Sequence, residues 1–358
     1  MSSHVYVIAE AGVNHNGELQ RAMEMVDVAA EAGADAVKFQ TFDPAALVTA
    51  AAAQAAYQIR NQGDAGGQLA MLAGLTLGQA EHHRLKAHCA QRGIAFLSSP
   101  FDPQSARFLI EELDLKLLKL GSGELTNAPL LLQIARAGRD LILSTGMADL
   151  AEIRAALGVL AFGYLGGTDP RRRAAFQTIL EDDAAWITLR RRVSLLHCTT
   201  EYPCPLEQVN LRAMDTLRDA FGLEVGYSDH TRGIEVSLMA AARGATILEK
   251  HFTLDRALPG PDHAASLEPD ELRELVAAVR RVELALGSAH KRMAPSEAGN
   301  RAVARKSLVA TRAIARGEPF GPDNLGSKRP GTGRSPMDYW DLLGTPAARD
   351  YAADEVIE

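Results

Sequence analysis

Two histidines, His230 and His251, have the sequence setting of ligands for a divalent metal ion. Each follows a short β-type run and a charged residue, and a Gly/Pro-rich loop with Asp262 comes next. Neutral imidazoles at the ends of neighbouring parallel strands, about 4.8 Å apart, can converge on one ion. One such histidine alone is more often an ordinary hydrogen-bonded residue. Two in consecutive strand ends favour a metal site.

Lysines and serines at the ends of other apolar runs indicate an anionic ligand. A buried ammonium group is unfavourable unless it is paired, and a ligand with phosphate and carboxylate groups would pair two of them. The alternative is that each lysine pairs with a structural glutamate. The polar strand-end residues available for such a ligand are Lys38, Gln40, Ser99, Lys119, Ser122, Ser144 and Ser228.

Two strand-end glutamates, Glu10 and Glu124, are candidates for proton transfer. The sequence contains no serine nucleophile elbow, no Walker phosphate loop and no CxxC pair. From the residues alone we therefore expect a metal-assisted enzyme that acts on a phosphorylated or carboxylated small molecule.

These residues follow eight apolar runs that alternate with helical segments. Eight βα units in roughly 290 residues favour a closed (β/α)8 TIM barrel, whose chemistry lies at the carboxyl ends of the strands. An open doubly wound sheet is the alternative, but the turn AEAGVNHNG after the first run is not GxGxxG. The predicted strands are Val5–Ala9, Ala36–Phe39, Ile94–Leu97, Leu117–Leu120, Leu141–Leu143, Val193–Leu196, Glu224–Tyr227 and Thr246–Glu249.

The chain divides into a predicted barrel, residues 1–287, a polar linker, 288–305, and a small domain, 306–358. The last segment is short enough to bury only a modest core, so we expect it to dock on the barrel or on a second subunit. Residues 43–77, rich in Ala, Gln and Gly, are too long for a simple crossover and are predicted to wrap over one end of the fold.

Composition excludes several classes of function. The chain has 358 residues and a formal net charge of −7 at pH 7, which argues against nucleic acid as a partner. Three cysteines without regular spacing indicate a reducing compartment. No uncharged apolar run approaches the ~18 residues of a membrane span, and no signal-peptide pattern is present. We expect a cytoplasmic protein.

Motifs along nearly the whole chain resemble the bacterial sialic acid synthase family. The tail, with RKSLVA, GEPF and KRPGTG, resembles the C-terminal antifreeze-like (SAF, β-clip) domain of that family. The motifs that carry the resemblance are IAEAGVNHNG, ADAVKFQTF, FLSSPFD, LKLGSGELTN, ILSTGM, LLHCTTEYP, GYSDHT, EKHFTLD and PGPDH.

The resemblance implies condensation of phosphoenolpyruvate with an N-acylated amino sugar to give a nine-carbon 2-keto acid and phosphate. It implies that His230 and His251 bind Mn²⁺ or Mg²⁺, and that the lysines and serines above bind phosphoenolpyruvate. It also implies that Arg329 reaches the sugar's acyl group from the partner subunit of a domain-swapped homodimer. The positions that it places near the sugar and the reacting carbons are Glu10, Glu124, Tyr202 and Asp262.

One departure concerns the acceptor sugar. Thr200, within CTTEYP, occupies a place where many N-acetylneuraminate synthases carry Asn; CTTEYP and the pattern YQxxNxG…QLxML resemble synthases of diacetyllegionaminate more closely. A polar exchange beside a sugar can discriminate between substrates strongly. The acceptor therefore stays open between N-acetylmannosamine and its diacetamido trideoxy analogue. The alternatives are a pseudaminate synthase of the same family, a Schiff-base pyruvate aldolase and a non-catalytic sugar- or ice-binding protein.

Overall fold

The computed structural model describes residues 4–63, 66–167 and 173–358. The chain forms two compact units, Met1–Gly287 and Ser288–Glu358, and each is described by itself. None of the helices in the described ranges is long and apolar enough to cross a membrane.

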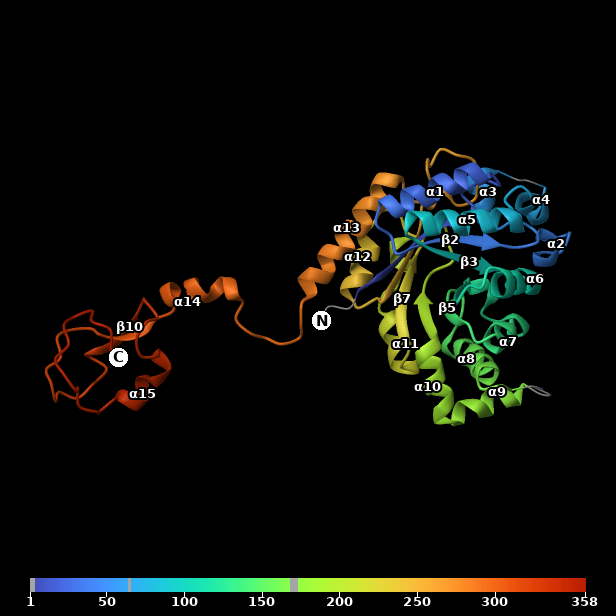
Figure 1. The fold of residues 1–358 in the computed structure, drawn as a ribbon. Helices are drawn as coiled ribbons and strands as arrows, with labels where there is room; N and C mark the ends of the chain where they lie inside the picture. Colours follow the sequence, from blue (N-terminus) through green and yellow to red (C-terminus); the bar gives the residue numbers. More distant parts are fainter. Residues whose placement is uncertain (1–3, 64–65, 168–172) are drawn as a thin grey trace. The chain divides into compact units, whose positions relative to one another are not determined.

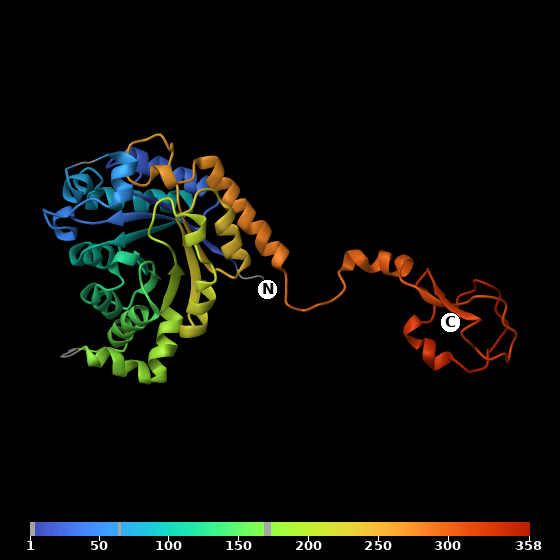
Figure 2. The same cartoon turned by 180° about the vertical axis from the view of Figure 1, so that it is seen from behind.

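The first unit is a (β/α)8 barrel, as predicted. Eight parallel strands pair in the order β3-β2-β1-β8-β7-β6-β5-β4, and the two end strands, β3 and β4, also lie next to each other. Figures 1 and 2 show the helices arranged around the outside of these strands. The strands are β1 (Tyr6–Gly12), β2 (Ala36–Thr41), β3 (Ala95–Pro100), β4 (Leu117–Leu120), β5 (Asp140–Ser144), β6 (Val193–His197), β7 (Glu224–Asp229) and β8 (Ile247–His251).

Most of the outer helices bury a face against the barrel, and the first of them is an example. In this helix, Ala22, Met25, Val26 and Ala29 are buried at helical spacing, and Gly33 ends the segment with a φ of 79°. The helices are α1 (Leu19–Glu31), α5 (Gln79–Arg92), α6 (Pro103–Arg107), α7 (Ala128–Arg136), α8 (Leu150–Tyr164), α9 (Ala174–Thr178), α10 (Asp183–Arg192), α11 (Ala213–Phe221), α12 (Glu235–Ala242) and α13 (Pro269–Leu286).

Most strands continue further into the polar residues than the sequence predicts. In the ladder between β1 and β2, Glu10 pairs with Lys38, and between β2 and β3, Gln40 pairs with Ser99. The barrel register therefore extends the backbone ladder beyond the apolar run. It fixes the polar side chains at one level of the barrel.

The segment between β2 and α5 contains three short helices, α2 (Pro44–Leu47), α3 (Ala56–Gln62) and α4 (Gln68–Ala73). Its apolar side chains pack in a cluster of their own, separate from the main barrel core. Local burial therefore stabilises this segment, since it adds no strand to the barrel.

The second unit has a small core of its own around Leu308, Ile314, Phe320 and Tyr351. Its antiparallel pair, β9 (Ser307–Ala310) and β10 (Leu325–Lys328), lies beside a single-turn helix, α15 (Tyr339–Leu342). The stretch predicted to be a plain linker carries a helix as well, α14 (Ala298–Ala304).

Candidate active site

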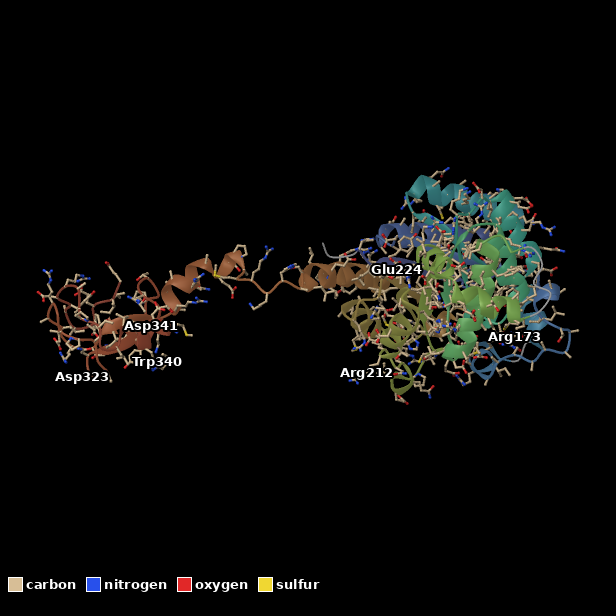
Figure 3. All side chains as sticks on the ribbon, turned by 90° about the horizontal axis from the view of Figure 1, so that it is seen from below. Arg173, Arg212, Glu224, Asp323, Trp340 and Asp341 are labelled. Carbon is tan, nitrogen blue, oxygen red and sulfur yellow. The ribbon has the colours of Figure 1, made fainter. Side chains whose placement is uncertain are left out.

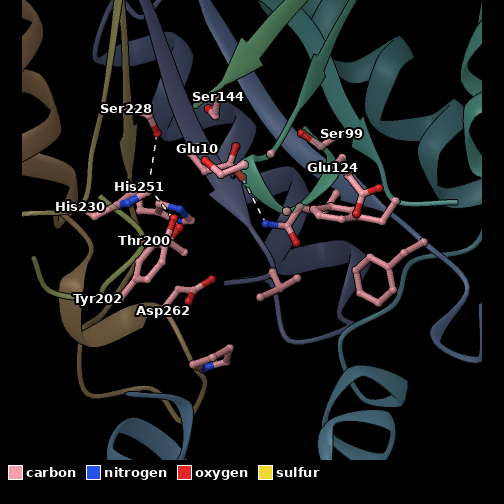
Figure 4. A pocket seen from close by; sticks show the side chains of 18 of the residues that line it. Glu10, Ser99, Glu124, Ser144, Thr200, Tyr202, Ser228, His230, His251 and Asp262 are labelled. Carbon is pink, nitrogen blue, oxygen red and sulfur yellow. Dashed lines mark hydrogen bonds between the residues drawn. The ribbon is translucent and has the colours of Figure 1, made fainter. Parts of the chain in front are cut away.

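A cavity of about 310 Å³ opens at the carboxyl ends of the barrel strands. Figure 4 shows its polar side chains pointing toward one another from several strands. The cavity is lined by every predicted site residue except Arg329, namely Glu10, Lys38, Gln40, Ser99, Lys119, Ser122, Glu124, Ser144, Thr200, Tyr202, Ser228, His230, His251 and Asp262.

Four buried, ion-paired residues line the cavity, and we call them the charged floor: Glu10, Lys38, Lys119 and Glu249. The Nζ atom of Lys38 lies 2.6 Å from Oε2 of Glu10 and 3.5 Å from Oε2 of Glu249. The Nζ atom of Lys119 lies 3.0 Å from Oε1 of Glu249. All four side chains are at most 7% exposed. Each buried charge thus has a partner, as burial requires.

The two floor carboxylates have opposite pKa shifts. Burial raises the pKa of Glu10 to about 7, although Lys38 favours its charged form. Burial would also raise the pKa of Glu249, but the ammonium groups of Lys119 and Lys38 together hold it below its usual range. With Glu10 protonated, two ammonium groups face one carboxylate and the floor carries one net positive charge. That charge complements an anionic ligand.

The two predicted metal ligands lie side by side at the ends of β7 and β8. The imidazole centroids of His230 and His251 are 5.7 Å apart. Burial lowers the pKa of His230 to about 4 and that of His251 well below its usual value, so both rings are neutral at pH 7. Nδ1 of His230 lies 2.7 Å from the carbonyl oxygen of Thr199. Because a carbonyl only accepts, this contact puts the lone pair of His230 on Nε2, which lies 3.1 Å from the hydroxyl of Tyr202, so a bound ion would take the place of that contact.

The residues present fit a divalent ion. Nδ1 of His251 is buried and has no hydrogen-bond partner among the described residues, and neutral imidazoles are ligands for first-row divalent ions, among which Mn²⁺ also needs oxygen ligands. Within the described ranges no third His, Cys, Asp or Glu completes a metal-binding group. The remaining ligands would therefore be water or substrate oxygens, as in catalytic metal sites.

Serine hydroxyls surround the floor. Ser99 accepts a hydrogen bond from Lys38 at 3.2 Å, and Ser228 donates one to Glu249 at 2.7 Å. Ser122 accepts from the amide of Gly146 at 2.9 Å. The hydroxyl of Ser144 is buried without a partner among the described residues, so it can donate to a bound anion.

Gly146 explains how these groups come so close. A Cβ atom there would lie 2.6 Å from Oγ1 of Thr200 and 2.8 Å from Oγ of Ser122. Only glycine therefore lets the turn after β5 approach both side chains.

Two further carboxyl groups line the cavity above the floor. Asp262 is 8% exposed, and burial raises its pKa to about 6. Burial also raises the pKa of Glu124, whose Oε2 atom accepts a hydrogen bond from Asn127 at 2.7 Å. Tyr202 packs its ring 4.1 Å from that of His230. Asp262 and Tyr202 lie on one side of the cavity and Glu124 on the other, so proton-transfer groups are present on both sides (Figure 4).

Arg329 is the predicted site residue that lies elsewhere, and two residues adjacent to the predicted ones, His263 and Asp229, also lie outside the cavity lining. Arg329 belongs to the second unit, where it is exposed just after β10. His263 is bound to Thr253 at 2.7 Å and does not line the cavity. Asp229 also faces away from the cavity, since it forms a buried ion pair of 3.0 Å with Lys250.

Glu249 is the functional residue that the sequence reasoning missed. The signal was present, because two lysines in buried strands need a buried carboxylate nearby, and Glu249 interrupts an apolar strand. The structural-glutamate alternative for the lysines is thus partly correct. Both lysines bind Glu249, and both also line the cavity.

Together these groups can bind an anion through ammonium and hydroxyl donors, hold a divalent ion through imidazoles, and exchange a proton near pH 7 through Glu10. A small molecule with phosphate and carboxylate groups, beside a second substrate with an oxygen on the ion, suits this arrangement.

Comparisons with known proteins agree with this chemistry. Residues 25–291 match the NeuB family, and residues 305–358 match the SAF domain. The chain is 46% identical over 351 residues to an N,N'-diacetyllegionaminic acid synthase of Campylobacter jejuni, covering 98% of each chain. It is 42% identical to a synthase of the same name from Legionella pneumophila, covering 97% of this chain and 92% of that one.

Solved structures show the same likeness. An N-acetylneuraminic acid (sialic acid) synthetase from Leptospira borgpetersenii, in complex with citrate, has a TM-score of 0.66 at 32% identity. That comparison covers 84% of this chain and 90% of the other. With a matching family model over most of the barrel and relatives aligned over nearly the whole chain, this protein belongs to the NeuB family.

Proposed function

We propose that the protein condenses phosphoenolpyruvate with an N-acetylated amino sugar, forming a nine-carbon 2-keto sugar acid and phosphate. The observation that carries the proposal is one cavity in which two paired lysines, four serine hydroxyls and two neutral imidazoles meet. The names of the relatives at 46% and 42% identity favour N,N'-diacetyllegionaminate over N-acetylneuraminate as the product. Pseudaminate synthase is the alternative within the family.

In the proposed reaction the charged floor holds phosphoenolpyruvate. Lys38 and Lys119 bind its phosphate and carboxylate, and the hydroxyl of Ser144 donates to one of its oxygens. C3 of phosphoenolpyruvate then forms a bond to C1 of the open-chain sugar, water adds at C2, and phosphate leaves from C2.

Glu10 is suited to manage the proton of the attacking water. Its pKa of about 7 lets it accept or return a proton at neutral pH, and Glu124, with a raised pKa, is the second candidate. Asp262 and Tyr202 are proposed to orient the sugar, with Thr200 and Gln40 beside them. A divalent ion, Mn²⁺ or Mg²⁺, bound by His230 and His251 would polarise the sugar aldehyde as a Lewis acid.

The test is phosphate release from phosphoenolpyruvate, measured with Mn²⁺ across a panel of amino sugars. We expect His251→Ala to lower turnover about 100-fold or more, because a Lewis acid contributes several kcal/mol to such a step. Electron paramagnetic resonance of free Mn²⁺ gives a second readout, weaker binding, that does not depend on activity. The matched control is His290→Ala, at an exposed position outside the barrel.

Phosphate release that needs no metal and survives His251→Ala would contradict the proposal. A pyruvate aldolase would instead form a Schiff base that borohydride traps. Glu10 and Glu249 raise the pKa of Lys38 despite its burial, which keeps this amine protonated and unsuited to that chemistry.

The proposal includes a homodimer in which Arg329 of one subunit contacts the acyl group of sugar bound by the other. Mixing two inactive variants, Arg329→Ala and His251→Ala, tests it. Random pairing makes about half of the dimers mixed, and only one of the two sites in each mixed dimer is complete, so a swapped dimer would recover about a quarter of the wild-type activity. No recovery after mixed refolding would count against the swap. We also propose a cytoplasmic location, consistent with three free cysteines.

A further inference from the structure

One side of the cavity carries a cluster of apolar side chains, although Tyr57, Gln58 and Gln68 of the segment between β2 and α5 line the cavity as well. Most of the apolar residues come from this same segment, and two come from loops after β1 and β3. These residues form one packed cluster, and all of them line the same cavity as the charged floor. We call this group the apolar wall; its members are Val13, Phe42, Leu47, Val48, Met71, Leu72, Leu75 and Phe101.

The wall differs from what a fully hydroxylated sugar requires. Its side chains contain no hydrogen-bond donor or acceptor beyond the weakly accepting sulfur of Met71. A sugar hydroxyl pressed against them would lose its water without gaining a partner, which is unfavourable. Methyl groups, by contrast, gain from leaving water at such a surface.

We propose that the apolar wall is the subsite for methyl groups of the acceptor, and that it selects a 6-deoxy sugar with two acetamido groups over N-acetylmannosamine. This inference rests on the proposed function. The 6-deoxy diacetamido sugar carries three methyl groups, two on its acyl groups and one at C6. N-acetylmannosamine has one methyl group and places a hydroxyl at C6.

The polar part of an acetamido group also has a partner in this cavity. The carboxylate of Asp262 accepts no hydrogen bond from any described residue, and it lines the cavity together with the wall. The N–H of an acetamido group would donate a hydrogen bond to this carboxylate. The methyl group of the same acetamido group would then contact the apolar wall. The ring centroids of Tyr57 and Tyr202 are 5.0 Å apart. Tyr57 closes the polar side of the cavity near Asp262.

The wall is exposed to the cavity and not to bulk solvent. Met71 is 6% exposed and Leu72 is 8% exposed, and Phe42 and Phe101 pack edge to face at 6.2 Å. Side chains held in this way present a fixed surface, which is a condition for discriminating between substituents of similar size.

The experiment compares three acceptors with the full-length enzyme, phosphoenolpyruvate and Mn²⁺. They are N-acetylmannosamine, its 6-deoxy analogue, and the 2,4-diacetamido-2,4,6-trideoxy sugar. We expect kcat/KM to rise along this series, by about tenfold or more for the C6 change alone. The near-isosteric variants Met71→Gln and Leu72→Asn should reduce the preference roughly tenfold and leave KM for phosphoenolpyruvate unchanged.

The matched control is Met239→Gln, the same exchange on the exposed face of α12. It should leave the ratios of kcat/KM among the three acceptors as in the wild type. If the first two variants fail to fold, Val48→Thr repeats the test at a half-buried wall position with an isosteric side chain. Saturation-transfer NMR on the wild type adds a readout that needs no turnover, since acceptor methyl protons should receive the strongest saturation.

Equal kcat/KM for the 6-deoxy and 6-hydroxy acceptors would overturn the inference. So would folded wall variants that keep the wild-type ratios, or saturation spread evenly over the sugar protons. No phosphate release with any acceptor would instead contradict the proposed function, so the two failures are distinguishable.

Discussion

The charged floor comes from four separate barrel strands, whereas the apolar wall comes mainly from one insertion between β2 and α5. Glu10, Lys38 and Glu249 are held by backbone ladders on both sides and Lys119 by a ladder on one side, and every charge has a buried partner. The wall residues are held by packing against one another. A change in the floor therefore leaves a charge unpaired, while a change in the wall removes only contact area.

The largest effect of a substitution is expected in the charged floor at Glu249, which lies between the two lysines. Glu249→Gln keeps the shape of the side chain and removes the charge that both ammonium groups contact. Breaking a buried ion pair from one side costs about 3–5 kcal/mol. We expect a loss of this size in the free energy of unfolding, measured with urea at pH 7, and a raised KM for phosphoenolpyruvate.

The control for this substitution is Glu224→Gln, at an exposed position at the start of β7 labelled in Figure 3. It should change stability by less than about 0.5 kcal/mol. If the two variants lose equal stability, the floor is not held by its ion pairs.

Asp262→Asn should stabilise the protein, whereas Glu249→Gln destabilises it, and the gain should depend on pH. Burial raises the pKa of Asp262 from 3.8 to about 6. The free energy of unfolding of the wild type therefore falls by up to about 3 kcal/mol as pH rises from below 3.8 through 6, because the folded state disfavours the ionised carboxylate. Asn has no such loss.

Urea unfolding at two pH values checks this prediction. We expect Asp262→Asn to be more stable than the wild type at pH 8 by up to about 3 kcal/mol, and to match it within about 1 kcal/mol near pH 4. The same variant should lose acceptor affinity. A stability difference that does not vary with pH would show that the carboxylate is not disfavoured by burial.

The smallest effect is expected in the wall. Val48→Ala removes two methyl groups at a half-buried position and should cost about 1 kcal/mol. Its KM for phosphoenolpyruvate should stay at the wild-type value. A loss as large as that of Glu249→Gln would remove the contrast between floor and wall.

The barrel and most of the cavity residues were predictable because both follow from simple periodicity. Buried parallel strands give contiguous apolar runs, and a polar residue just after such a run must lie at the carboxyl end of the barrel. His230, Ser144 and Ser99 are found there for this reason. Glu249 was missed because it lies inside a strand, where only the charge balance of its neighbours reveals it.

The wall was not predictable from the sequence in the same way. Three of its residues, Leu47, Met71 and Leu72, belong to two short helices without a long apolar period; the others lie in loops, and all eight meet only through tertiary packing. The segment could be assigned to one end of the fold from its length, but not to a chemical role. The helix α14, in a stretch predicted to be a linker, escaped notice because its seven residues have no apolar stripe.

The continuity of residues 42–75 has a consequence for protein engineering. One stretch of chain supplies six of the eight wall side chains, and none of the four ion-paired ones. This stretch can be treated as a cassette. Grafting the corresponding cassette from a relative with a different sugar substrate would exchange most of the apolar wall while the ion-paired residues, and the polar groups proposed to orient the sugar, stay intact.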